Sequence, residues 1–152
     1  MPISVASPAR HPGLASALRD LVRATLGLEG RLPGEIGVVL SDDETLRALN
    51  RRWRGINRAT DVLSFGYDDR AGRVSGDLVI SLERMREQAR RFRTGLGREL
   101  ARLVVHGTLH LTGLDHHRDA ERRHMRRREV AALRAARATV ARLDRSLDAP
   151  RG

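Results

Sequence analysis

Residues 106–117 read HGTLHLTGLDHH, and the interpretation of the whole chain starts from this stretch. His106 and His110 are four residues apart, so on an α-helix they lie one turn apart on the same face. Two imidazoles in that arrangement reach a single metal ion, and His116, six residues further on, supplies a third nitrogen ligand. Three nitrogen ligands fit zinc and leave a fourth position open for water, which is typical of catalytic sites.

The neighbours of the histidines limit the chemistry. In zinc proteases with a related pattern, a glutamate follows the first histidine and serves as general base. Here that position is Gly107, whose missing side chain allows another element to pack closely against the helix. A bound metal acidifies water by itself, so hydrolysis is still expected without this glutamate. His117 is an alternative third ligand, and Asp115 either orients a ligand or is a solvated loop residue.

The spacing of apolar residues organises the rest of the chain into an alternation of helices and strands. A capping box of Ser41 and Glu44 predicts a helix that extends to about Arg52. The other predicted helices cover 14–28, 82–93, 97–111 and 119–143. The predicted strands cover 36–40, 62–66 and 76–81. The glycine-rich segment between the last two strands indicates a hairpin or a crossing loop. This order is typical of an α+β domain with a small sheet.

Length and composition indicate one globular domain over residues 1–152. The 152 residues are 40% hydrophobic and 32% charged, and they include no cysteine, so any metal must use histidine or carboxylate ligands. No apolar run approaches the roughly 20 residues that span a bilayer, and the first residues do not resemble a signal peptide. We therefore expect a cytoplasmic protein without a membrane partner.

The positive charge is unevenly distributed. The net charge is +10, and all 29 basic residues are arginine. Residues 1–83 are neutral overall, so the whole excess lies in 84–152, where the run RRHMRRRE contains Arg126, Arg127 and Arg128. A basic half suggests a polyanion such as a nucleic acid or an acidic surface. The alternative is a solvated, arginine-rich helix face.

Three blocks of the sequence resemble the YbeY family of endoribonucleases and rRNA maturation factors. HGTLHLTGLDH at 106–116 is similar to the family signature H-G-x-L-H-L-x-G-x-D-H. LNRRWRGINRATDVLSF at 49–65 is similar to L-N-x-x-[YFW]-R-x-x-x-x-x-T-D-V-L-S-F, and GDLVIS at 76–81 to G-D-I-x-I-S. The matching blocks extend over about residues 36–130.

The resemblance implies a small mixed sheet, mostly parallel, flanked by helices, with the metal site at one end. It implies one zinc ion per chain, held by His106, His110 and His116. It also implies metal-dependent cleavage of single-stranded RNA in rRNA processing and ribosome quality control, with the ribosome or a ribosomal subunit as partner. The family's functional arginine falls on Arg54, so catalysis is assigned to Arg54 and His106. From the residues alone, Arg54 is instead the polar end of a helix whose Trp53 packs in the core.

The sequence is therefore compatible with three functions. The leading one is an endoribonuclease in which Arg54 and the metal stabilise charge on the phosphate while a metal-activated hydroxide attacks; attack by the 2′-hydroxyl is the alternative route. The second is a metallohydrolase of another substrate, such as a peptide, which Gly107 and the charge of +10 disfavour. The third is a ribosome-associated RNA-binding protein that zinc only stabilises, with Arg126, Arg127 and Arg128 in contact with RNA.

Overall fold

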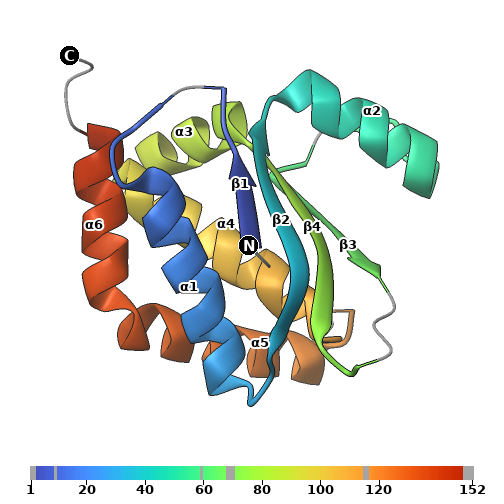
Figure 1. Ribbon diagram of the computed structural model, residues 1–152. Helices are drawn as coiled ribbons and strands as arrows, with labels where there is room; N and C mark the ends of the chain where they lie inside the picture. The colour runs from blue at the N-terminus through green and yellow to red at the C-terminus, as the bar shows by residue number, and fades with distance from the viewer. Residues whose placement is uncertain (1–2, 9, 59, 68–70, 115–116, 149–152) are drawn as a thin grey trace.

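The computed structural model describes residues 3–8, 10–58, 60–67, 71–114 and 117–148. In these ranges the elements run in the order β1 (Ile3–Ala6), α1 (Leu14–Leu28), β2 (Pro33–Ser41), α2 (Asp43–Arg54), β3 (Val62–Tyr67), β4 (Val74–Ser81), α3 (Leu82–Arg91), α4 (Leu96–Leu111), α5 (Asp119–Ala135) and α6 (Arg137–Asp148). Figure 1 shows a single sheet with helices around it, which confirms the predicted α+β fold. No helix in the described part is long and apolar enough to cross a membrane.

The sheet is mixed and mostly parallel, as the resemblance implied. Its strand order is β1-β2-β4-β3. The β1–β2 and β2–β4 pairs are parallel, and β3 runs antiparallel to β4 at one edge. Because β3 and β4 are consecutive and antiparallel, the segment between them closes a hairpin, one of the two predicted alternatives. The antiparallel edge matters for function, because β3 forms one wall of the site described below.

Strand β1 was not predicted from the sequence. It has four residues, and its parallel register places Ile3 beside Ile36 and Val5 beside Val38. Four residues give too few alternations for a period of two to stand out. The side chain that anchors the strand is Ile3, which is completely buried. Strand β2 is also longer than predicted, since it begins at Pro33 rather than Ile36.

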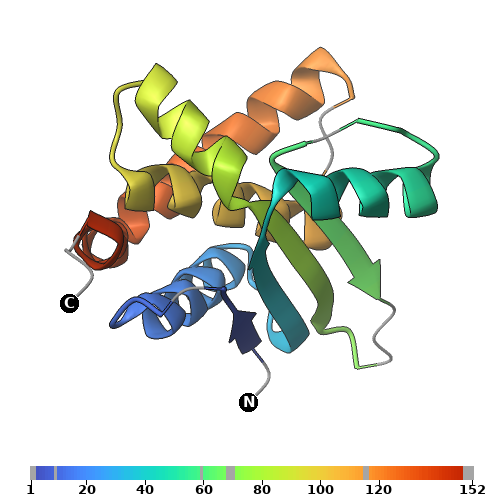
Figure 2. The ribbon, with the colours of Figure 1, turned by 90° about the horizontal axis from the view of Figure 1, so that it is seen from above.

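The two faces of the sheet carry different helices. On one face, Val38, Leu78 and Ile80 pack in the main core, to which α1, α4, α5 and α6 contribute. On the other face, Leu63 and Val79 form a smaller core with Leu46 of α2. The alternation of strand side chains between faces explains this division. Figure 2 shows α2 apart from the group of helices on the other side, so α2 is held by a much smaller apolar contact.

Helix α4 is the central helix of the larger layer. It contacts β3, β4, α1, α3, α5 and α6. Close approach at its start depends on Gly97, where an added Cβ would collide with the backbone of Leu143 and Asp144 in α6. Asp144 Oδ1 also accepts a hydrogen bond of 2.9 Å from the backbone N–H of Arg98. The helix that carries the histidine motif is therefore clamped at its other end by α6.

The predicted helix over 119–143 is wrong, because two helices replace it. Helix α5 ends at Ala135, and α6 begins at Arg137. The intervening Ala136 is 5% exposed, and Leu143 beyond it is fully buried. The chain turns here because burial of the apolar face of α6 against α1 and α4 outweighs the local preference for a continuous helix. No glycine or proline marks the break.

The predicted capping box at the start of α2 is also wrong. Ser41 is the last residue of β2, and Asp42 caps the helix by accepting a 2.8 Å hydrogen bond from the backbone N–H of Thr45. This hydrogen bond lowers the pKa of Asp42, because it favours the charged carboxylate. The prediction for α3 is confirmed, since Ser81 Oγ accepts a hydrogen bond from the N–H of Arg84 at 3.2 Å.

Candidate metal centre

The structure places His106 and His110 side by side near the end of α4. Their ring centroids are 4.7 Å apart, with the rings edge to face. Both residues are partly exposed, and both line a cleft of about 570 Å³. The helix turns its apolar stripe, including Leu103 and Val104, into the core, so the two imidazoles stand at the edge of that stripe as the sequence pattern requires.

The predicted third ligand, His116, and the neighbouring Asp115 lie outside the described residues. His117 is described, is exposed, and lines the same cleft. Among the residues whose placement is given, no three histidine, cysteine, aspartate or glutamate side chains form a group able to hold a metal. Two adjacent imidazoles are nevertheless the donor chemistry that zinc takes. The assignment of His116 as third ligand stays a prediction.

Glu129 of α5 contacts His106, a contact that was not predicted from the sequence. Its Oε1 atom lies against Nδ1 of His106, with the side chains of histidine and glutamate 25% and 16% exposed. A carboxylate in this position accepts a hydrogen bond from Nδ1–H, and this tautomer leaves the lone pair on Nε2 for a metal. The signal was available, because Glu129 follows the buried Met125 by one turn. An acid on the apolar stripe of a helix needs a partner.

Gly107 lies against the sheet, as its buried position predicted. A Cβ at this residue would lie 2.9 Å from Leu78 Cδ2, 3.2 Å from Ser64 Oγ and 3.3 Å from Val62 Cγ2. The carbonyl of Gly107 accepts a 3.2 Å hydrogen bond from Ser64 Oγ. A glutamate here would push α4 away from β3 and β4, so the helix position excludes the general base of the related proteases.

Arg54 reaches the same cleft from the end of α2. Its Nη2 donates a 3.2 Å hydrogen bond to the carbonyl of Ser64, and its Cζ lies 5.9 Å from the ring centroid of Phe65. The cleft is lined by Arg54 together with both histidines of α4. The alternative that placed Trp53 in the core is wrong, because Trp53 is 63% exposed.

A charged network supports the wall of the cleft. Asp61 Oδ1 accepts a 2.8 Å hydrogen bond from the N–H of Val62, and Oδ2 lies 3.8 Å from Arg102 Nη2. Arg102 is also bound by Glu99, which is only 3% exposed, through hydrogen bonds of 2.9 and 2.7 Å. The hydrogen bond to Glu99 raises the pKa of Arg102. Arg102 precedes His106 by one turn, so this network fixes the helix below the histidines.

The three predicted RNA-binding arginines of α5 differ in their surroundings. Arg126 and Arg127 are exposed and line a small groove with Arg123 and Val130. Arg128 is half-buried, and its guanidinium binds Glu29 at 2.6 and 2.8 Å and the carbonyl of Leu28 at 3.3 Å. Arg128 therefore joins α5 to the end of α1, whereas the other two present their charge to solvent.

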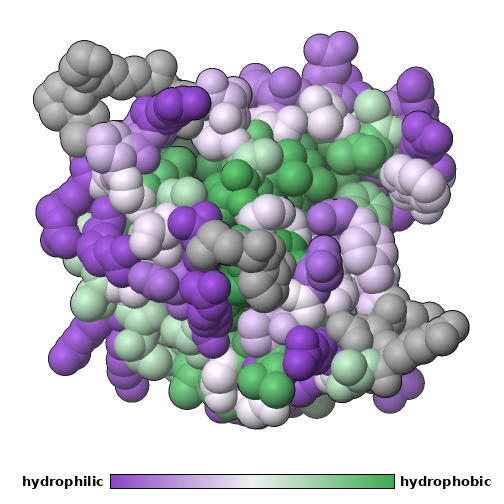
Figure 3. Space-filling view, viewed as in Figure 1, coloured by the Kyte–Doolittle hydropathy of each residue, from purple (hydrophilic) through white to green (hydrophobic). Residues whose placement is uncertain are grey.

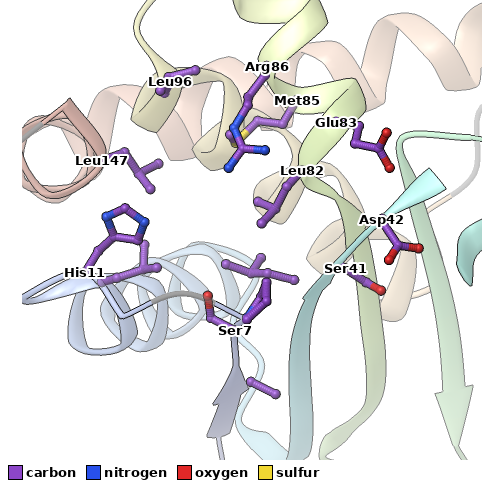
Figure 4. A pocket seen from close by; sticks show the side chains of 14 residues that line it. Ser7, His11, Ser41, Asp42, Leu82, Glu83, Met85, Arg86, Leu96 and Leu147 are labelled. Atoms are coloured by element: carbon purple, nitrogen blue, oxygen red, sulfur yellow. The ribbon is translucent and has the colours of Figure 1, made fainter. Parts of the chain in front are cut away.

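A second cavity, of about 760 Å³, lies where β1, β2 and β4 end. Its floor is mainly apolar, with Leu40, Leu82 and Met85, and Figure 4 shows His11 and Arg86 reaching into it from the segment before α1 and from α3. In Figure 3, which has the same view as Figure 1, apolar surface gathers in the upper middle, near the ends of these strands. None of the predicted site residues that the structure describes lines this larger cavity, whereas Arg54, His106 and His110 line the smaller one.

Known proteins resemble the chain over most of its length. The profile of the family described as "Endoribonuclease YbeY" matches residues 9–137. A protein named Endoribonuclease YbeY from Anaeromyxobacter sp. (strain Fw109-5) is 44% identical over 138 residues, covering 88% of this chain and 72% of the relative. Its namesake from Carboxydothermus hydrogenoformans is 43% identical over 123 residues, covering 80% and 85%. The solution structure of TM1509 from Thermotoga maritima superposes with a TM-score of 0.67 at 26% identity, covering 99% and 98%.

Proposed function

The chain belongs to the Endoribonuclease YbeY family and is an endoribonuclease, and from this premise we propose that it cuts single-stranded RNA with zinc bound at the cleft between α4 and β3. One observation carries the proposal. Arg54 and the pair His106 and His110, which are more than fifty residues apart in the chain, line one polar cleft. A permanent positive charge for the phosphate beside two imidazole ligands for a metal fits metal-assisted cleavage of a phosphodiester.

We propose that zinc is held by His106 and His110, with His116 as the third ligand. The partly exposed imidazoles at one cleft and the carboxylate at His106 Nδ1 support this assignment. When bound, the metal supplies Lewis acidity that polarises a phosphoryl oxygen and acidifies water. Glu129 holds the His106 ring in one orientation and one tautomer, so this ligand is in place before the ion binds.

Arg54 has the role of phosphate binder in this proposal. It already donates one N–H to the carbonyl of Ser64, which fixes the guanidinium at the wall of the cleft. A guanidinium has five N–H donors, so several remain to grip the oxygens of a phosphate as a fork. Negative charge that develops on the phosphate is then met by a permanent positive charge held in position. Attack by water and attack by the 2′-hydroxyl both fit this arrangement.

The experiment is cleavage of an end-labelled RNA, offered as a single strand and as a duplex of the same sequence. Purified protein with zinc is compared with His106→Ala and His110→Ala, and the matched control is His124→Ala, because His124 is exposed on α5. We expect cleavage of the single strand by the wild type and the control, and loss in both ligand variants. Wild-type rates in His106→Ala and His110→Ala would show contamination and overturn the proposal.

The same experiment separates the other functions. A peptide hydrolase would leave the RNA intact and cleave an unstructured polypeptide, and a zinc-stabilised RNA-binding protein would retain the RNA without cutting it. We also propose that the cellular substrate is ribosomal RNA in the cytoplasm and that a ribosomal subunit is the partner. Support comes from the family membership and from the charge of +10, which favours a polyanionic surface. Co-sedimentation of the catalytically inactive His110→Ala protein with ribosomal subunits tests this part.

A further inference from the structure

The single tryptophan of the chain stands on the surface. Trp53 is 63% exposed, although tryptophan is highly buried on average. It follows Leu46 by seven residues and Leu49 by four, so all three lie on one stripe of α2. Leu46 is fully buried and Leu49 is partly buried. Figure 1 shows the end of α2 reaching out beyond the strands, so the stripe outruns the sheet and Trp53 is left uncovered.

The surroundings of Trp53 are strongly basic. Residues 45–60 contain five arginines and no acid. The guanidinium carbon of Arg52 lies 5.2 Å from the centre of the Trp53 ring, a cation–π contact that covers one part of the indole. Ile56, just beyond the helix, is 44% exposed and adds apolar surface. An exposed aromatic ring among unopposed arginines is typical of surfaces that bind single-stranded nucleic acid.

We propose that Trp53, backed by Arg52, is a stacking platform for one base of the single-stranded substrate, next to the phosphate that Arg54 binds. The inference rests on the proposed function, because Arg54 fixes where the backbone runs. Trp53 and Arg54 are consecutive residues whose side chains diverge by about 100° around α2, so the RNA strand must curve around the end of the helix to place a phosphate on Arg54 and an adjacent base on Trp53. The platform thereby favours unpaired RNA, since a base inside a duplex cannot leave its stack without a cost.

A protein partner is the other class of occupant for an exposed tryptophan. The charges around Trp53 favour RNA, because the arginines of 45–60 match a run of phosphates. Stacking on an indole is also tolerant of base identity, because every base has a π-face. The platform therefore gives preference for single strands without requiring a particular sequence.

Fluorescence tests the platform directly, because the chain has one tryptophan. The probes are a 2′-O-methyl oligouridylate and an abasic sugar-phosphate oligomer of the same length, titrated into the zinc-loaded protein with intact probe verified by gel. We expect the base-bearing probe to quench Trp53 emission and the abasic probe to leave it largely unchanged. Equal quenching by both probes, or none by either despite binding measured by anisotropy, overturns the platform.

Variants complete the test. Trp53→Ala should weaken binding of the base-bearing probe by roughly 5- to 150-fold, the range expected for one stacked base, while Trp53→Phe retains most of the affinity. The matched control is Phe92→Ala, because Phe92 is 62% exposed and Arg91 lies 5.7 Å from its ring, at the far end of α3. Unchanged binding in Trp53→Ala, or an equal loss in Phe92→Ala, overturns the inference.

Kinetics separate this inference from the proposed function. On a cleavable single strand, Trp53→Ala should raise KM and leave kcat nearly unchanged, because the base is stacked equally in the bound substrate and in the transition state. If the wild type cleaves RNA and Trp53→Ala has an unaltered KM, the platform fails while the endoribonuclease stands. If the wild type does not cleave RNA at all, the proposed function itself fails.

Discussion

Helices α2 and α5 are both rich in arginine, but they present their charge differently. In α5, Arg122 binds Asp119 at 2.7 Å, Arg118 lies 3.8 Å from Glu121, and Arg128 is bound to Glu29. In α2 and the segment that follows it, none of the five arginines of 45–60 forms an ion pair with any residue that the structure describes. The arginines of 45–60 are thus more available to bind phosphate than those of α5.

The difference shows why net charge over half a chain is a poor guide to a binding surface. Residues 1–83 are neutral overall because acids elsewhere, including Asp43 and Glu44 in the first turn of α2, offset the arginines of 45–60. Charge acts over about one Debye length, roughly 8–10 Å in physiological salt, so local neighbours decide the potential that RNA meets. On that scale the part of α2 beyond Asp43 and Glu44 is a basic surface beside the cleft, whereas the acids of α5 extend from its first turn to Glu129.

The largest expected effect concerns the histidines, because both basic helices matter only if the cleft is the metal centre. Replacing His106, His110 or His116 with alanine should each sharply reduce the metal content from one zinc per chain. His124→Ala should leave it unchanged, since His124 is exposed on α5. Elemental analysis of the purified proteins measures this. Full metal content in all three ligand variants would show that the cleft is not the metal centre, and the comparison of α2 with α5 would then have no bearing on catalysis.

Arg54→Ala is the next test and bears on α2 alone. Loss of one preorganised electrostatic donor should lower kcat roughly 10²- to 10³-fold. Arg54→Lys keeps the charge but loses the fork, so it should restore only part of the rate. The fold should persist, because Arg54 and its neighbour Trp53 are both exposed. Circular dichroism and zinc content accompany the rate measurement, and native-like activity in Arg54→Ala would remove this arginine from the mechanism.

Glu129 gives α5 a role that does not depend on its arginines, namely to orient His106. Glu129→Gln should lower zinc affinity by about 10- to 100-fold, because the partner that orients a histidine ligand is weakened. Competition with a calibrated chelator measures the affinity without reference to activity. The matched control is Glu121→Gln, since Glu121 lies on the same helix and faces Arg118. An equal affinity in the two variants would show that Glu129 only packs against His106.

The smallest effects come from exchanging arginines in sets. Replacing Arg47, Arg51 and Arg52 with glutamine should flatten the plot of log affinity against log salt by up to about 0.7 per lost contact on single-stranded RNA. Replacing Arg126, Arg127 and Arg128 should flatten it less, because Arg128 is bound to Glu29. Anisotropy titrations at several salt concentrations compare the sets. A larger change in the α5 set would reverse the order of the two surfaces.

Long periodic segments were predictable from the sequence, while features that depend on distant partners were not. Helix α4 and the strands around Val62 and Leu78 carry many apolar residues at one spacing, so their type was predicted correctly. The break at Ala136 has no local signal, because burial of α6 against other helices causes it. Whether Trp53 is covered depends on how far the sheet extends beneath α2, which no window of sequence contains.

The candidate site shows the same limit. Spacing alone brought His106 and His110 together, because a helical turn is a local property. The resemblance, rather than any local spacing, indicated Arg54, which comes from another element. Glu129 was not predicted as a site residue because its partner lies 23 residues earlier in the chain. Its place on a buried stripe was readable, but the identity of the group it meets was not.

The central position of α4 has a consequence for how the metal acts on the folded chain. Its amide hydrogens near Leu103, Val104 and Val105 lie in the middle of the core, so they should exchange with solvent only when the whole chain unfolds. The imidazole pair at the end of this helix is then already assembled in the apo protein. A metal that binds only the native state should slow exchange of these buried amides by one common factor, set by its concentration and affinity.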